Sequence, residues 1–192
     1  VVYLNGELLD PAQEDGSKDH PYNTLAEAYT ALGGGDGTIV LCGDLPVTVH
    51  SENYTDRSFF SAKTGNIVIT GKDPTTGVEY HPVITASSTS TSATYIEFFT
   101  PTEISYLTFN KTTSGTFYFL TGPSLTFGEG MVFTNNGALL SGTGTDVIGV
   151  RLGSYINQLP TAEYTQLSGT LGSVYGGNSK QKIDVDASVT DK

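Results

Sequence analysis

The chain has 192 residues, a length that suits one domain with a substantial core. Nine basic residues stand against 20 acidic ones, so the formal net charge of −11 disfavours binding to nucleic acid or anionic lipid. A single cysteine excludes an intramolecular disulfide framework and a cysteine-based zinc site, and no apolar run has the length of a membrane span.

The first 36 residues are expected to form an N-terminal cap that contains one helix. Thr24 and Glu27 have the spacing of a capping box, in which each side chain bonds a backbone N–H at the other's position. Apolar residues then recur at helical spacing until a glycine-rich break begins at Gly33. The pattern predicts an amphipathic helix over 24–33, with its apolar stripe formed by Leu25, Ala28, Tyr29 and Leu32.

Four polar residues precede this helix closely enough to suggest a site: Asp15, Ser17, Asp19 and His20. Catalytic groups converge through the fold and rarely work as neighbours in a turn, so we favour a structural role. In that interpretation the segment bends the chain into a helix that covers the end of the first sheet. A calcium site at Asp15 and Asp19 is the alternative.

Residues 37–178 repeat one unit, a short β-branched or aromatic run followed by a turn rich in Gly, Thr, Pro or Asn. The steps between equivalent runs are about 21 to 27 residues, which predicts an all-β solenoid whose coils form a parallel β-helix. One series of strands centres near Ile96, Tyr118, Leu139 and Gln166, and a second near Ile104, Leu125, Ile148 and Leu171.

Asparagines end the repeated units, at Asn110, Asn135, Asn157 and Asn178. They are expected either to stack as a hydrogen-bonded ladder or simply to favour turns. The aromatic residues just before them are expected to pack in the core for the most part: Phe109, Phe133, Tyr155 and Tyr175.

Two segments depart from the repeat. Residues 72–94 exceed one coil and predict an insertion that projects as a loop, a natural place for a binding feature. Residues 179–192 are expected to form a polar C-terminal tail, or a coil that leads to a segment outside this sequence.

The opening residues resemble the N-terminal cap and first coil of the pectate-lyase-like right-handed parallel β-helix superfamily. The resemblance covers residues 15 to about 43 and implies a right-handed, single-stranded parallel β-helix with a capping helix, from a bacterial surface or adhesin-like member. The superfamily includes lyases, hydrolases and non-catalytic adhesins, so it does not imply an activity. The matching residues are Asp15, Gly16, Pro21, Thr24, Leu25, Ala28, Leu32, Gly37, Thr38, Ile39 and Leu41.

Lyases of this superfamily, by the same resemblance, hold calcium with acidic residues beside an Arg or Lys base. Between residues 100 and 178 the nearest approach is Asp146 with Arg151, and a solvated surface pair is the favoured interpretation. The other acidic residues of this range, Glu103, Glu129 and Glu163, form no pair that a glycoside hydrolase would need.

The remaining chemical groups favour ordinary roles. Asp184 and Asp186 share a strand face in the tail and allow a weak cation site, while Cys42 is expected to be a buried apolar residue. The triplets at Asn53 and Asn110 match glycosylation acceptors that arise readily by chance in a Thr-rich chain. The lone histidines are expected on the surface, namely His50, beside Ser51 and Glu52, and His81.

We therefore predict no catalytic residue, no metal ligand and no cofactor, and leave the binding residues and oligomeric state open. The favoured function is a non-catalytic secreted or cell-surface module, adhesin-like, that binds glycans or host or matrix proteins. Its signal peptide is expected outside this sequence, because "VVYLNG" lacks the layout of one. The alternatives are a carbohydrate-active enzyme, whole or partial, and a structural spacer.

Overall fold

The protein is described here by a computed structural model that covers residues 1–7, 13–51, 65–88, 94–121, 123–140, 148–152, 161–175 and 186–191. These residues form a mostly β structure with one short helix and three sheets, none of which closes on itself. The prediction of a β-rich fold with parallel strands is confirmed.

The first sheet has seven strands in the order β1 (Val2–Leu4), β2 (Gly37–Leu41), β5 (Ile67–Thr70), β8 (Thr102–Ser105), β11 (Ser124–Phe127), β15 (Thr161–Gln166) and β17 (Asp186–Asp191). The second sheet contains β3 (Leu45–Thr48), β6 (Val83–Ser87), β9 (Thr108–Lys111), β12 (Val132–Asn135) and β13 (Ala138–Leu139). The third sheet contains β4 (His50–Ser51), β7 (Thr94–Phe98), β10 (Phe117–Thr121), β14 (Ile148–Leu152) and β16 (Ser173–Tyr175).

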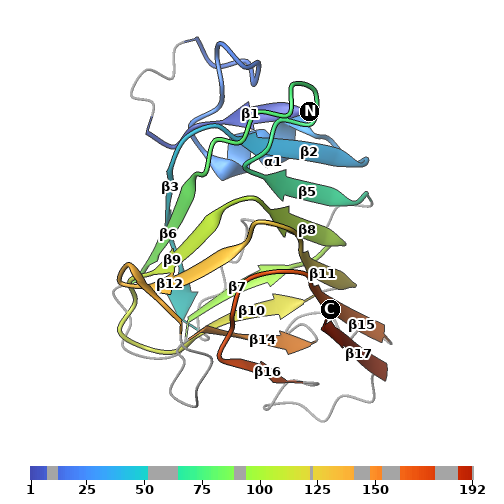
Figure 1. Ribbon diagram of the computed structural model, residues 1–192. Helices are drawn as coiled ribbons and strands as arrows, with labels where there is room; N and C mark the ends of the chain where they lie inside the picture. The colour runs from blue at the N-terminus through green and yellow to red at the C-terminus, as the bar shows by residue number, and fades with distance from the viewer. Residues whose placement is uncertain are drawn as a thin grey trace.

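From β5 to β12 the chain visits the first, second and third sheets in turn. Each of these strands except β7 pairs in parallel with the strand one pass earlier, so that Thr102 of β8 lies level with Leu125 of β11, 23 residues later. The strand β7 pairs antiparallel with the short β4. Figure 1 shows the strands of the first sheet stepping down one side of the molecule and those of the second sheet down the other. Equivalent positions of successive passes therefore form rows that run across the strands.

The three sheets face a common apolar core. The ring of Phe119 in the third sheet lies 4.8 Å from Phe109 in the second and 5.0 Å from Phe127 in the first, measured between ring centroids, and both contacts are edge-on. Edge-on aromatic pairs contribute about 0.5–1.5 kcal/mol each beyond the burial of their area. This cluster fixes how far apart the sheets stand.

The helix α1 (Leu25–Ala31) begins at the predicted residue, with the hydroxyl of Thr24 accepting a hydrogen bond from the backbone N–H of Glu27. The carboxylate of Glu27 accepts from the Thr24 hydroxyl, not from a backbone N–H as the predicted capping box requires. Its buried face consists of Leu25, Ala28 and Tyr29, and its nearest strand is β1. The segment before it adds to the first sheet, because Tyr22 pairs with Leu4 beyond the β1 edge.

The predicted strand series are right for the first two passes and wrong afterwards. Ile96 and Tyr118 do lie on paired strands, but Leu139 lies in β13 of the second sheet and Ile148 in the third. The cause is a hairpin at Asn136 and Gly137, which both have positive φ and turn β13 back antiparallel to β12. An Asn-Gly pair between strands favours this type I′ turn.

Of the two alternatives for the asparagines, the stacked ladder is wrong for the pair that the structure describes. Asn110 is level with Thr85 and Thr134, whereas Asn135 is level with Lys111. The amide oxygen of Asn110 instead accepts hydrogen bonds from the hydroxyl of Thr134 and from a backbone N–H in the hairpin. Phe109 and Phe133 pack in the core as predicted, Tyr175 lies in β16, and the three other residues of the two series, Asn157, Asn178 and Tyr155, lie outside the described ranges.

Two predicted boundaries can be compared with the strands. The expected insertion at 72–94 includes β6, which pairs on both sides within the second sheet, so a projecting loop can involve only the residues that flank it. The expected tail at 179–192 includes β17, which pairs in parallel with β15.

Asp73 joins the N-terminal segment to the turn after β5. Its carboxylate is fully buried and accepts hydrogen bonds from the hydroxyl of Thr76 at 2.7 Å and the N–H of Thr75 at 2.8 Å. The ammonium of Lys18, in the N-terminal segment, lies 3.5 Å from the same carboxylate. The Thr76 hydroxyl, with these other donors, holds the pKa of Asp73 well below its ordinary value, although desolvation opposes the shift.

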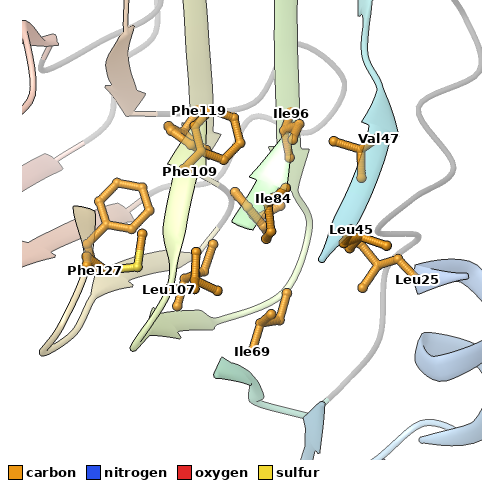
Figure 2. Close-up of a pocket in the computed structure, with 13 residues that line it drawn as sticks. Leu25, Leu45, Val47, Ile69, Ile84, Ile96, Leu107, Phe109, Phe119 and Phe127 are labelled. Carbon is orange, nitrogen blue, oxygen red and sulfur yellow. The ribbon is translucent and has the colours of Figure 1, made fainter. Parts of the chain in front are cut away.

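The core leaves an apolar cavity of about 30 Å³ between the helix and the three sheets. Figure 2 shows Leu45, Val47 and Ile84 pointing toward it from the second sheet, with Phe119 opposite from the third. A cavity without polar lining stays dry, so its walls lose van der Waals contacts.

We predict that Val47→Ile stabilises the protein by up to about 1 kcal/mol, because the added methylene enters this cavity. Thermal unfolding measures the effect. Val40→Ile is the matched control, since Val40 is fully buried but does not line the cavity and overpacking costs about 1–3 kcal/mol. Equal effects of the two substitutions would show that the cavity offers no space.

We predict that Asp73→Asn destabilises the protein most near neutral pH. A carboxyl whose pKa is lowered by folding stabilises the fold above its unfolded pKa, and this stabilisation is lost as the pH falls below about 4. Urea unfolding of both proteins from pH 7 to pH 3 should give midpoints that converge on acidification. A constant difference across this range would contradict the assignment.

Candidate functional site

A residue with left-handed backbone conformation recurs where the chain passes from the first sheet to the second. His81, Tyr106 and Gly130 have φ of 52°, 53° and 69°, and each lies two residues before a strand of the second sheet. The backbone N–H of Tyr106 donates to the carbonyl of Glu129, so these turns stack from pass to pass. We call this stacked turn region the corner.

Charged and aromatic side chains of three successive passes meet at the corner. The ammonium of Lys72 lies 2.8 Å from a carboxylate oxygen of Glu79 and 4.5 Å above the ring of Tyr106. The hydroxyl of Tyr106 donates to Glu129 at 2.6 Å, and the imidazole of His81 lies 4.0 Å from the other Glu79 oxygen. The result is one continuous chain of contacts on the surface, which we call the corner ladder.

Contacts within the corner ladder shift the pKa values of its titratable side chains. The hydrogen bond with Lys72 lowers the pKa of Glu79 and reciprocally raises that of Lys72. The hydrogen bond that the Tyr106 hydroxyl donates to Glu129 raises the pKa of Tyr106, and desolvation and the nearby negative charge add to the shift. At neutral pH the ladder therefore offers charged acceptors, a charged donor and a neutral phenol.

Two of the three corner positions hold large side chains at a cost. The left-handed conformation costs a residue other than glycine about 1–2 kcal/mol, and glycine occupies the same position at Gly130. His81 is exposed and Tyr106 is half-buried, so neither strained residue recovers this cost by full burial in the core. Strained residues retained on a surface point to a role other than folding.

The corner borders a surface of the second sheet that lacks charge. The outward residues of its strands form two rows, one of Val83, Thr108 and Val132 and the other of Pro46, Thr85, Asn110 and Thr134. The one charged residue in strands β3, β6, β9 and β12 is Lys111, whose side chain is buried and donates to the carbonyl of Thr113 at 2.6 Å. We call these two rows, with Thr48, the neutral face.

Several polar groups of the neutral face remain available to a ligand. The hydroxyls of Thr48, Thr85 and Thr108 and the amide nitrogen of Asn110 make no hydrogen bond within the described part of the chain. Each can both donate and accept, except the amide nitrogen, which only donates. The neutral face and the corner ladder together form the candidate site.

Three of the four polar residues before the helix, Asp15, Ser17 and His20, hydrogen-bond one another in a turn, as the favoured structural role predicts. The carboxylate of Asp15 accepts from the N–H of Ser17 at 2.8 Å, and the Ser17 hydroxyl accepts from the N–H of His20 at 3.2 Å. The side chain of Ser17, followed by its backbone N–H, lowers the pKa of Asp15. These bonds close a local turn. Within the described ranges no group of three or more His, Cys, Asp or Glu side chains is arranged to hold a metal ion.

Arg151 stacks on aromatic rings in the third sheet. Its guanidinium carbon lies 3.8 Å from the ring centroid of Tyr118 and 5.8 Å from that of Tyr95, and the two tyrosines stack 5.7 Å apart. Its suggested partner Asp146 lies outside the described residues. Tyr118 is only 9% exposed, so we interpret this stack as structural.

The other candidates from the sequence do not gather into a site. Cys42 is half-buried with its thiol 3.5 Å from the carbonyl of Leu4, and burial raises its pKa. Asn110, one of the two glycosylation triplets, lies in a strand with its amide oxygen bonded, while Asn53 lies outside the described residues, as do Glu52 and Asp184. His50 and Ser51 form β4, Asp186 begins β17, and Glu103 and Glu163 lie on the first sheet.

Sequence reasoning placed His81 among lone histidines and did not join Lys72, Glu79, Tyr106 and Glu129. A signal was nevertheless present, since residues 81, 106 and 130 precede three strands of the second sheet at nearly equal intervals. Aligning the repeat by the strands of the second sheet, rather than by the two series of strand centres used above, would have placed residues 81, 106 and 130 at equivalent positions.

Comparisons of the chain with protein-family models, with curated proteins and with solved structures found no match. In the described part of the chain, no helix has the length and apolar character needed to cross a bilayer. The site must therefore be interpreted from its own geometry.

We predict that Tyr106→Gly is more stable than Tyr106→Ala by about 1 kcal/mol. Both variants lose the exposed contacts with Lys72 and Glu129, but only glycine relieves the left-handed strain, and its greater freedom when unfolded offsets part of the gain. Chemical denaturation measures the difference. An alanine variant as stable as the glycine variant would show that the corner is not strained.

Proposed function

We propose that the chain is a right-handed parallel β-helix that serves as a non-catalytic, adhesin-like glycan-binding module of a secreted or cell-surface protein. The regular visits to three sheets in parallel register support the β-helix. Each pass from one sheet through the others would then be one coil.

The observation that most supports glycan binding is the corner ladder. It keeps the exposed His81 and the half-buried Tyr106 in strained conformations and surrounds them with two carboxylates and an ammonium group. Sugars present many hydroxyls that both donate and accept, so a site with paired donors and acceptors suits them. The acidic, Thr- and Ser-rich composition and the single cysteine support a secreted or surface location.

We expect Tyr106→Gly to weaken glycan binding at least tenfold while the protein stays folded, because the site loses the phenol and Lys72 loses the ring on which it stacks. Binding is measured against a panel of glycans immobilised on a surface. Asn136→Gly is the matched control, since it also replaces a left-handed residue by glycine but lies in the β12–β13 hairpin.

The same panel distinguishes the other functions. Reducing ends or unsaturated products released by the unmodified chain, and lost in Glu79→Gln or Glu129→Gln, would contradict a non-catalytic role and indicate an enzyme. Binding to matrix proteins without binding to any glycan would indicate that the module is an adhesin for proteins. Failure to bind either glycans or matrix proteins would favour a structural spacer.

A further inference from the structure

We propose that the ligand is an uncharged polysaccharide that extends from the corner ladder onto the neutral face of the second sheet. The inference rests on the proposed glycan binding and adds the chemical class of the glycan and the residues that select it. Its basis is a separate observation, the charge and hydrogen-bonding pattern of the neutral face.

The field around the neutral face opposes acidic polymers. The chain has a formal net charge of −11, and exposed Asp44, Glu79 and Glu129 border the face at its corner side. Lys72 is the cation of the ladder, and its charge is already paired with Glu79. A polyanion such as a uronic acid polymer would approach against this field, whereas an uncharged polymer would not.

The groups on the face suit a neutral polymer. The free hydroxyls of Thr85 and Thr108 lie on neighbouring strands, beside the free amide nitrogen of Asn110, and Val83 and Val132 flank Thr108 in its row. Sugars combine hydroxyl edges with apolar C–H surfaces, so alternating polar and apolar groups match both. Thr134 at the end of the longer row is buried, so its accessible part consists of Pro46, Thr85 and Asn110. Three strands spaced about 4.8 Å apart give this part a span of about 10 Å, enough for more than one sugar unit.

The buried Lys111 is consistent with this selectivity. It is the one cation in strands β3, β6, β9 and β12, and it points away from the face with its ammonium bonded to the Thr113 carbonyl. The face therefore presents no counter-charge to an acidic sugar.

The test compares neutral with acidic polysaccharides of similar length, such as galactomannan and polygalacturonate, by calorimetry at low and high salt. We expect the neutral polymer to bind equally at both salt concentrations and the acidic polymer to bind more weakly, most of all at low salt. The double substitution Thr85→Val and Thr108→Val should weaken neutral binding about tenfold, because it removes two hydroxyls while retaining shape and β propensity.

Thr126→Val is the matched control, since Thr126 is an outward threonine of the first sheet. Thermal unfolding of each variant confirms that it is folded. Tighter binding of the acidic polymer, or neutral binding that the double substitution leaves unchanged, would overturn the inference while glycan binding itself stands. Failure of every glycan to bind would overturn both proposals.

Discussion

Backbone hydrogen bonds between parallel strands hold each pass of the chain in a fixed register on the previous one. The contacts of Phe119 with Phe109 and Phe127 then join the three sheets through a shared core. Because a shift of register by one residue would exchange inward and outward side chains, the aromatic core also determines which residues face solvent. The neutral face and the corner exist because this register repeats.

The same register explains why the corner is the natural place for function. Stacked turns bring together residues far apart in sequence, such as Lys72 and Glu129, without any change to the core. The core accepts little variation in volume, whereas a surface turn tolerates almost any side chain. At Tyr106 the chain has a bulky residue in a backbone conformation that glycine adopts freely. Since the fold itself would be served better by glycine, the tyrosine side chain is best explained by a role in the site.

Much of the fold could be predicted from local patterns. Thr24 and Glu27 predicted the start of the helix, and β-branched and aromatic runs predicted most strands, because these signals act over a few residues. The predicted positions of equivalent strands are wrong after residue 135, because the Asn136-Gly137 hairpin adds an antiparallel strand. The segment 72–94, predicted as a natural place for a binding feature, contains Lys72, Glu79 and His81 of the candidate site. Their contacts with Tyr106 and Glu129 were not predicted, since left-handed backbone at His81 and Tyr106 depends on tertiary packing and not on residue type.

The most direct test of the central claim is to locate a bound neutral polysaccharide by backbone amide chemical shifts. Our account predicts that the largest changes occur at residues 79–85, 106–110 and 129–134, where the corner meets the second sheet. The outward positions of the first sheet, including Glu103 and Thr126, should change little. Changes concentrated in the first or third sheet, with the corner unaffected, would contradict the account.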